Sequence, residues 1–398
     1  MMVTRRPPLI APKRRLPTPL VAHARRSARA RGLVAALSLA LLAGCGGGEK
    51  AESPLSPQAM AAIGTRPGAP REALARAVDE LFTDPMLGET RALVVMHRGR
   101  IVAERYAPGY GPNTKLIGWS MSKTITGVLI GLLISDGRLT LDESAPVPSW
   151  QRPGDPRGEI TLRQLLQMRS GLRHVETATP AGDADTVRML VLDGRDDMAA
   201  YAEAQPLVAE PGSRWEYSTA TSVILADIAA RALTDSRDPA ARRQAVIDYL
   251  RSRLFIPAGM TSATPEFDAS GTMLGGSMIH ATARDWAKFG EFLRNNGMVN
   301  GARIVPSDWV RFMLTPAPHN PGYGAQIWLN RHQPSGEEEL FPARGKANIF
   351  AAIGHLGQYV IVSPDQELTV VRLGKTDHAM RPALVRKLAD IVQLYNQD

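Results

Sequence analysis

The chain has 398 residues, a length that predicts one large two-part domain or two domains. Of these residues 44% are hydrophobic and 22% charged, values typical of a globular protein. Its formal net charge is +8, but residues 1–44 hold nine Lys and Arg and no acidic residue, so the remaining residues carry a net charge of −1. The part of the chain after residue 44 therefore has no excess of basic residues. This removes the main support for nucleic-acid binding.

The basic leader contains an apolar run over residues 33–43, which is too short for a settled transmembrane helix and predicts a signal peptide over residues 1–44. The run leads into Leu42-Ala43-Gly44-Cys45, which resembles the lipobox of bacterial lipoproteins. That resemblance implies lipidation of Cys45 and an exported protein anchored to a membrane of the bacterial cell envelope. An ordinary secretory signal cut nearby, giving a periplasmic protein, is the alternative. Cys45 is the only cysteine, which excludes an intramolecular disulfide and a cysteine-based zinc site.

Residues 45–71 are rich in Gly, Pro, Ala and Ser and predict a flexible linker. We expect the folded domain to occupy residues 72–398 and to begin with a helix over residues 74–82. Two runs of apolar and β-branched residues, 92–96 and 101–106, then flank Arg98-Gly99-Arg100 and predict a β-hairpin.

A serine and a lysine lie one helical turn apart at the start of the next helix, which is apolar almost all round and ends near Gly137. Residues three apart share a helix face, so the Lys123 amine can reach the Ser120 hydroxyl and take up its proton. An exposed helix turn is the ordinary interpretation of such a pair. Here, however, the apolar helix would bury the amine, and a buried lysine needs a partner.

Helices are predicted over residues 162–168 and 223–229, strands over 324–329, 351–353, 359–362 and 368–373, and a closing helix over 381–395. Strands at both ends with helices between them predict an α+β fold (an α/β sandwich). Its antiparallel sheet is flanked by helices and built from residues 72–140 and 285–398. Residues 141–284 are expected to form an inserted all-α subdomain.

Two further segments carry candidate chemistry. Tyr217 follows a Pro-Gly turn just before a helix; it could be a half-buried packing residue, or a proton acceptor whose pKa a nearby lysine lowers. His355 lies between Gly354 and Gly357 at the start of a strand, where glycine allows a backbone N–H to approach a substrate closely. His355 could also be a strand-end residue with no role.

Together these segments resemble the serine β-lactamase and penicillin-binding-protein superfamily, and most of all its class C-like branch of esterases and 6-aminohexanoate-dimer hydrolases. Ser120-Met121-Ser122-Lys123 is similar to the Ser-x-x-Lys motif, Tyr217-Ser218-Thr219 to Tyr-x-Asn, and His355-Leu356-Gly357 to Lys-Thr-Gly. Residues 160–172 and 281–290 resemble two further helical segments of the superfamily. The resemblance therefore covers the chain from about residue 72 onward and implies a β-lactamase/transpeptidase-like fold.

The resemblance implies a serine hydrolase in which Ser120 attacks a carbonyl carbon and an acyl-enzyme forms and is hydrolysed. Lys123 and Tyr217 would shuttle protons, and either one could accept the first. The backbone N–H groups of Ser120 and Gln358 would form the oxyanion hole, where one donor contributes about 2.7–4 kcal/mol. The resemblance implies no metal and no cofactor.

Departures from the motifs bear on the substrate, which Thr219, His355 and Gly357 are expected to contact. Thr219 offers one hydroxyl where the motif has an amide, and His355, mostly neutral at pH 7, replaces a lysine. Much of the hold on a substrate carboxylate is thereby lost. We therefore expect a small-molecule ester or linear amide substrate, with β-lactamase or D-alanyl-D-alanine carboxypeptidase activity as the alternative.

Other classes of protein remain open. A catalytically silent peptidoglycan-binding lipoprotein would have no physical need for a buried amine beside Ser120. A Ser-His-Asp hydrolase is poorly supported because no Gly-x-Ser-x-Gly elbow occurs, and a zinc enzyme because no His-Glu-x-x-His occurs. The sequence does not fix the oligomeric state.

Overall fold

The computed structural model describes residues 55–395, all within a compact unit that spans residues 54–398. Its helices are α1 (Pro57–Ala61), α2 (Arg71–Thr83), α3 (Ser122–Ser135), α4 (Leu162–Leu166), α5 (Asp185–Val191), α6 (Met198–Glu203), α7 (Thr219–Leu233), α8 (Pro239–Leu250), α9 (Ala283–Arg294), α10 (Ser307–Met313) and α11 (Arg381–Gln393).

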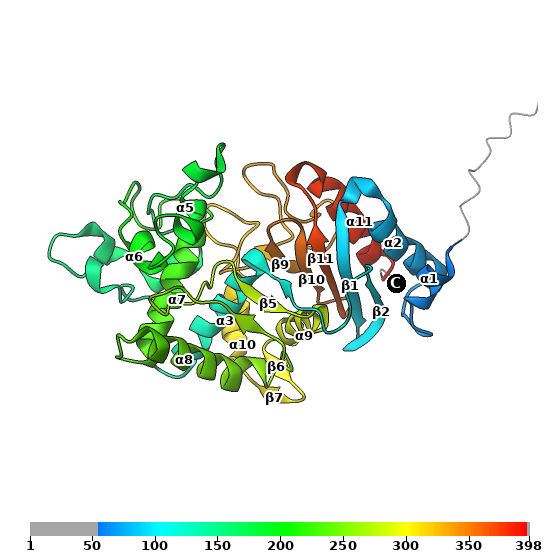
Figure 1. The fold of residues 1–398 in the computed structure, drawn as a ribbon, viewed down its shortest axis with the longest axis horizontal. Coiled ribbons are helices and arrows are strands. Elements are labelled where there is room, and N and C mark those ends of the chain that lie inside the picture. The colour runs from blue at the N-terminus through cyan, green and yellow to red at the C-terminus, as the bar shows by residue number, and fades with distance from the viewer. Residues whose placement is uncertain (1–54, 396–398) are drawn as a thin grey trace, which may run out of the picture. The chain divides into compact units, whose positions relative to one another are not determined.

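A six-stranded antiparallel sheet in the order β2-β1-β11-β10-β9-β8 organises this unit (Figure 1). Its strands are β1 (Glu89–His97), β2 (Arg100–Tyr106), β8 (Trp328–Leu329), β9 (Phe350–Gly354), β10 (Gln358–Ser363) and β11 (Leu368–Lys375). The first long strand, β1, pairs directly with the last, β11, in a register that places Val94 opposite Val371. Strands from both ends of the domain therefore form one sheet, as predicted.

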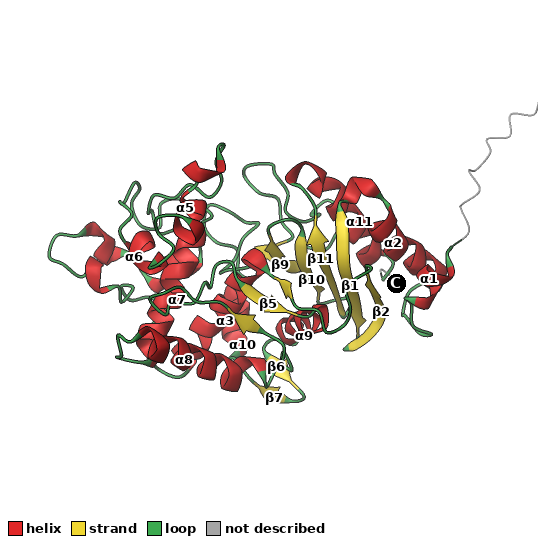
Figure 2. Cartoon of the chain, viewed as in Figure 1, coloured by secondary structure: helices red, strands yellow, loops and turns green. Residues whose placement is uncertain are grey.

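Alternating side chains of the sheet enter two separate hydrophobic cores. On one face, Leu93 and Val370 pack with α2 and α11, and on the other, Val94 and Val371 pack with α9. Figure 2 shows these helices on the two sides of the sheet. The core on the α9 side of the sheet continues into the helical part around α3, which is buried from Ser122 to Leu133. The predicted α+β class, with helices flanking an antiparallel sheet, is confirmed.

The predicted hairpin at Arg98-Gly99-Arg100 is also confirmed, since β1 and β2 pair antiparallel there. Arg98 and Gly99 both have positive φ, the backbone conformation that a two-residue hairpin turn requires. Helices α2 and α7 likewise contain the segments predicted to be helical, whereas α4 and α11 begin where predicted and each end two residues earlier.

Three predicted boundaries are wrong. The linker was expected to extend to residue 71, but α1 begins at Pro57, capped by Ser56, and Ile63 is buried and bridged to Ala103 of β2. Composition concealed this segment because proline at the first position of a helix and small buried residues look like a tether. Of the strand expected over residues 324–329, only β8 forms. Gln326 has positive φ, and its backbone N–H bonds to Leu166 instead.

The third boundary concerns residues 141–284, which were expected to be wholly helical. They contain α4 to α8, but also the short strands β4 (Thr264–Pro265) and β5 (Ile279–Ala281). Strand β5 pairs with β4 on one side and with β3 (Leu116–Ile117) on the other, in a three-stranded sheet next to the start of α3. A further two-stranded ribbon consists of β6 (Met298–Val299) and β7 (Ala302–Arg303).

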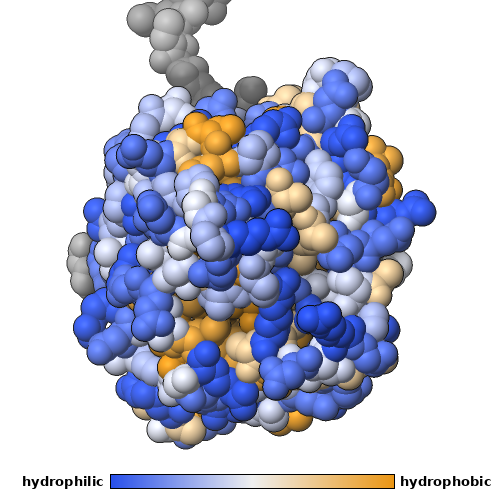
Figure 3. Space-filling view, turned by 90° about the vertical axis from the view of Figure 1, so that its left-hand side faces the viewer, coloured by the Kyte–Doolittle hydropathy of each residue, from blue (hydrophilic) through white to orange (hydrophobic). Residues whose placement is uncertain are grey.

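The end of the unit formed by α5 and α6 has a mostly hydrophilic surface, with hydrophobic residues in separate small groups (Figure 3). Val191, Leu192 and Val208 are among its exposed apolar side chains. Such scattered apolar residues are ordinary for a protein surface.

Candidate active site

Ser120 lies in a 3₁₀ turn (Trp119–Met121) directly before α3 rather than inside the helix. The turn is held by the Met121 N–H, which donates to Gly118 O, and by the Gly118 N–H, which donates to Ile279 O. Trp119 has a positive φ of 48°, a strained conformation for a bulky residue. The strained turn sets the Ser120 hydroxyl at the N-terminal end of α3, where the helix dipole adds positive potential.

Lys123 meets the Ser120 hydroxyl as predicted, with its Nζ donating to Ser120 Oγ at 3.0 Å. The same ammonium donates to Thr219 Oγ1 and to Gly276 O, each at 2.8 Å. All three of its donors therefore have acceptors, although the side chain is only 2% exposed. Burial lowers the pKa of Lys123 to about 8, and the charge of Glu176 opposes that shift.

Tyr217 lies two residues before α7, with its ring centroid 4.8 Å from Lys123 Nζ. The prediction of a lowered pKa is wrong, because burial and the charge of Glu176 raise the pKa of Tyr217 well above its usual value, against a smaller effect of hydrogen bonding to Ser120. The ammonium faces the ring rather than the hydroxyl, so its charge does not offset these effects. Tyr217 therefore remains a neutral phenol at physiological pH.

Thr219 was expected to contact substrate, but its side chain is buried and its hydroxyl donates to Glu176 Oε1 at 2.6 Å while accepting from Lys123. Glu176 Oε2 also accepts from the Thr219 backbone N–H at 2.8 Å and lies 2.7 Å from His174 Nε2. A continuous chain of polar contacts thus runs from Ser120 through Lys123 and Thr219 to Glu176.

Burial raises the pKa of the Glu176 carboxyl, but the hydrogen bond from His174, the charges of Lys123 and His174 and the hydrogen bond from Thr219 outweigh it and bring the pKa down to about 2. Glu176 is therefore an anion at neutral pH and the counter-ion of the buried Lys123. Sequence reasoning missed both Glu176 and His174. Their only signal is a position shortly after the Ser-Gly-Leu turn at residues 170–172, and nothing in the local pattern sets them apart from loop residues.

The turn that joins β9 to β10 forms another wall of the site. His355 is exposed there, its ring 5.5 Å from that of Trp119 in an edge-to-face arrangement. Partial desolvation lowers its pKa, so His355 is neutral at pH 7. Leu356 and Gly357 follow with positive φ values of 60° and 78°.

Gln358, whose backbone N–H is the second predicted oxyanion-hole donor, begins β10. Its side chain is buried beneath the turn and donates to the carbonyls of His355 and Leu356. Gln358 does not itself line the cavity that Ser120 opens into, whereas the turn residues do. The role of its N–H stays a prediction.

Ser120 opens into a cavity of about 470 Å³. Two loops line it, one through Thr177 and the other through Glu337 and Glu339. Trp215, Tyr217 and Trp328 form an aromatic wall, in which Tyr217 and Trp328 stack with centroids 5.4 Å apart. A substrate in this cavity therefore meets an aromatic wall.

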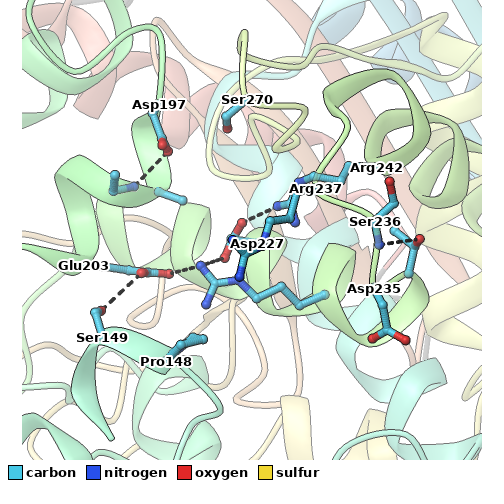
Figure 4. A pocket seen from close by; sticks show the side chains of 14 residues that line it. Pro148, Ser149, Asp197, Glu203, Asp227, Asp235, Ser236, Arg237, Arg242 and Ser270 are labelled. Carbon is cyan, nitrogen blue, oxygen red and sulfur yellow. Dashed lines mark hydrogen bonds and ion pairs between the residues drawn. The ribbon is translucent and has the colours of Figure 1, made fainter. Parts of the chain in front are cut away.

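A second cavity, of about 620 Å³, lies away from Ser120 between α6 and α7 (Figure 4). There Arg231 reaches both Glu203, at 3.2 Å, and Asp227, at 2.6 Å, and Arg242 binds Asp227 at 2.5 Å. Burial is the main effect on the pKa of Glu203 and raises it. The charge of Arg231 opposes this shift and the charge of Asp227 adds to it, and the resulting pKa is about 7. These charges pair with one another and join the two helices.

Over residues 55–395 no group of three or more His, Cys, Asp or Glu is placed to hold a metal ion. Within the same range no helix is long and apolar enough to cross a membrane. Cys45 and the predicted signal peptide lie outside the described residues.

Comparison with known proteins gives three concordant results. A family model described as Beta-lactamase matches residues 78–394. The 6-aminohexanoate-dimer hydrolase of Paenarthrobacter ureafaciens is 28% identical over 234 residues, which cover 56% of this chain and 57% of that protein. The chain thus matches little more than half the length of this relative.

Solved structures share the fold. A putative 6-aminohexanoate-dimer hydrolase from Bacillus anthracis matches with a TM-score of 0.63 and 22% identity, covering 80% of this chain and 83% of that one. A family VIII carboxylesterase matches with a TM-score of 0.59 and 16% identity, covering 81% and 97% of the two chains.

Proposed function

The chain belongs to the beta-lactamase family, whose members are typically serine hydrolases, and from this membership and the geometry around Ser120 we propose that it hydrolyses an ester or a linear amide through an acyl-enzyme. In this proposal Ser120 Oγ bonds to the substrate carbonyl carbon while its proton passes to the neutral form of Lys123. The leaving group takes up a proton as it departs, and water then releases the acyl group by the same route.

One observation carries the proposal: the buried Lys123 ammonium donates to Ser120 Oγ at 3.0 Å and has a pKa lowered to about 8. A fraction of this lysine is therefore neutral near physiological pH and able to accept the hydroxyl proton. Tyr217, whose pKa is raised, is better suited to donate a proton to the leaving group than to accept the first one.

The choice of an ester or linear amide as substrate rests on the residues that line the cavity with Ser120. His355 is neutral, Leu356 has no hydroxyl, and Glu176, Glu337 and Glu339 place carboxylates around the cavity. Arg381, the one Arg or Lys among the residues that line the cavity, is already paired with Glu339, so the cavity offers no free arginine or lysine to hold a substrate carboxylate. A relative named for a 6-aminohexanoate dimer, which is a linear amide, supports the same choice.

The experiment that tests the proposal is intact-mass measurement of the domain after exposure to a fluorophosphonate ester probe. We expect one adduct on the wild type, none on Ser120→Ala, and an undiminished adduct on Ser122→Ala. Ser122 is the matched control, since it lies two residues away and accepts a hydrogen bond from the Ile279 N–H.

Labelling of Ser120→Ala, or none on the folded wild type, would contradict the proposed nucleophile. Lys123→Met should lose labelling as well, because it removes the amine that lies 3.0 Å from Ser120 Oγ. After a positive result, ampicillin should be turned over far more slowly than p-nitrophenyl esters, and turnover at a dedicated lactamase's rate would overturn the substrate assignment.

We further propose that the chain is exported and lipid-anchored through Cys45. The lipobox-like Leu42-Ala43-Gly44-Cys45 supports this. Mass spectrometry of the mature N-terminal peptide should find a diacylglyceryl group on Cys45. Unmodified cysteine, or cleavage at another residue, would contradict the anchor.

A further inference from the structure

Arg372 is a buried charge with no carboxylate beside it. It lies in β11 with a side chain that is 0% exposed, and none of the ion pairs in the described part of the chain includes it. Burial lowers its pKa to about 10, so the guanidinium is still charged at neutral pH. An arginine in this situation requires an unusual arrangement of acceptors.

The guanidinium finds five acceptors for its five N–H groups, and all of them are uncharged. They are the hydroxyls of Thr90 and Thr376 and the backbone carbonyls of Glu89, Leu356 and Gly357. The contact with Gly357 O is short, 2.8 Å, and that with Leu356 O is 3.4 Å. Two of the five bonds therefore hold the turn that lines the Ser120 cavity.

Each of the three carbonyls of this turn accepts a hydrogen bond from a protein group. Gln358 Nε2 donates to His355 O at 2.9 Å and to Leu356 O at 3.1 Å, the Thr376 N–H donates to Leu356 O at 3.0 Å, and Arg372 holds Gly357 O. In a planar trans peptide, a carbonyl and the following N–H point in opposite directions. Arg372 contacts the Leu356 and Gly357 carbonyls, so the N–H groups that follow them, those of Gly357 and Gln358, are directed away from the guanidinium. The His355 carbonyl is held by Gln358 Nε2, so the Leu356 N–H is directed away from that side chain.

Two of these N–H groups lack partners. Neither Leu356 N nor Gly357 N donates to any acceptor among residues 55–395, although both residues line the cavity with Ser120. Gly357 also leaves no room for a side chain, because an added Cβ would lie 2.9 Å from Arg372 Nη1. Unpartnered amides at a cavity wall are suited to a ligand oxygen that gains negative charge.

We propose that Arg372 is a positioning residue for acyl transfer at Ser120: its guanidinium holds the peptide groups of the 355–357 turn so that their N–H groups face the substrate carbonyl oxygen. The inference rests on the proposed function. When Ser120 Oγ bonds to the carbonyl carbon, the π electron pair moves to that oxygen, and the turn amides bind it. Arg372 exchanges no proton, but its charge polarises the same peptide groups and makes their N–H groups stronger donors.

The test compares p-nitrophenyl butanoate with its thiono analogue, in which sulfur replaces the carbonyl oxygen. Sulfur is larger and a weaker hydrogen-bond acceptor, so amides aimed at an oxyanion favour the ester. Arg372→Lys keeps the charge but has at most three donors and no planar fork. We expect acylation by the ester to fall about 10- to 100-fold and acylation by the thionoester by less than about threefold, with KM within threefold of wild type.

Arg91→Lys is the matched control, since Arg91 lies on the neighbouring strand β1 but pairs with Glu89. Its ester-to-thionoester ratio should equal that of the wild type. Equal losses for both substrates in folded Arg372→Lys would reduce Arg372 to a structural role and overturn the inference, as would no loss. If fluorophosphonate labels Ser120 but the ratio stays unchanged, the inference fails while the proposed function stands; if Ser120 is not labelled, both fail.

A second measurement uses the wild type, in case Arg372→Lys does not fold. With selective ¹⁵N labelling of Leu, Gly and Gln, an adduct of Ser120 with a trifluoromethyl ketone should move the amide proton of Leu356, Gly357 or Gln358 downfield. An adduct that leaves all three resonances in place would overturn the inference.

Discussion

At the scale of single residues, Lys123 and Glu176 determine when the site can work. Lys123 must be neutral to accept the Ser120 proton, and its pKa is lowered to about 8. We expect kcat/KM for ester hydrolysis to rise about tenfold per pH unit below pH 8 and to level off above it. A stopped-flow pH profile checks this, and a flat profile between pH 6 and 9 would remove Lys123 as the base.

Glu176 provides the second prediction, because its negative charge favours the protonated form of Lys123. In Glu176→Gln that charge is gone, so the pKa of Lys123 falls further and the acidic limb of the kcat/KM profile moves to lower pH. Glu216→Gln, at a carboxylate paired with Arg214, serves as control and should leave the limb in place. A limb that moves to higher pH in Glu176→Gln would contradict the assignment of Glu176 as counter-ion.

Spacing along the chain predicted which residues approach Ser120 but not how they interact. The Ser120–Lys123 pair follows from the spacing of three residues, whereas Glu176 is linked to Lys123 only through Thr219, at the start of α7. The raised pKa of Tyr217 depends on burial and on Glu176, neither of which can be seen in the segment around Tyr217.

At the scale of elements, α3 packs so closely against α10 that glycine is required at one position. A Cβ on Gly131 would overlap the indole of Trp309, whose Nε1 donates to Gly127 O at 3.1 Å. We expect Gly131→Ala to lower the free energy of unfolding by about 1–3 kcal/mol, because overpacking outweighs the better helix propensity of alanine. Urea unfolding measures this, with Gly111→Ala, where an added Cβ meets nothing within 4 Å, as a neutral control.

The contact of α6 with α7 predicts a pH dependence of stability. The pKa of Glu203 is raised from 4.5 to about 7, so the folded state binds this proton more tightly than the unfolded chain. The resulting stabilisation is complete below pH 4.5 and is lost as the pH rises through 7. Melting temperatures between pH 5 and 8 should therefore decline less in Glu203→Gln than in wild type. Glu210→Gln, an exposed acid, should follow the wild type, and an unchanged decline in Glu203→Gln would contradict the role of Glu203.

At the scale of the whole domain, the order of strands and helices could be predicted because β-branched runs and amphipathic periods are local signals. The N-terminal boundary could not, since the burial of Ile63 depends on β2, about forty residues later. A chain beginning at residue 72 should be less stable than one beginning at residue 55 by about 2–4 kcal/mol, the value of burying Ile63 and its neighbours. Urea unfolding of the two chains decides this, and equal stabilities would restore the linker interpretation.

The direct pairing of β1 with β11 also has a consequence for how the protein is made. Residues 89–97 are synthesised long before residues 368–375, so the centre of the sheet cannot close until residues 368–375 have been made. Until then β1 is paired only with β2 and its other edge has no partner, and pairing over so large a sequence separation is slow. The nascent chain should therefore depend on chaperones that shield it, and a nonsense mutation anywhere before residue 368 should give an aggregating product rather than a smaller folded protein.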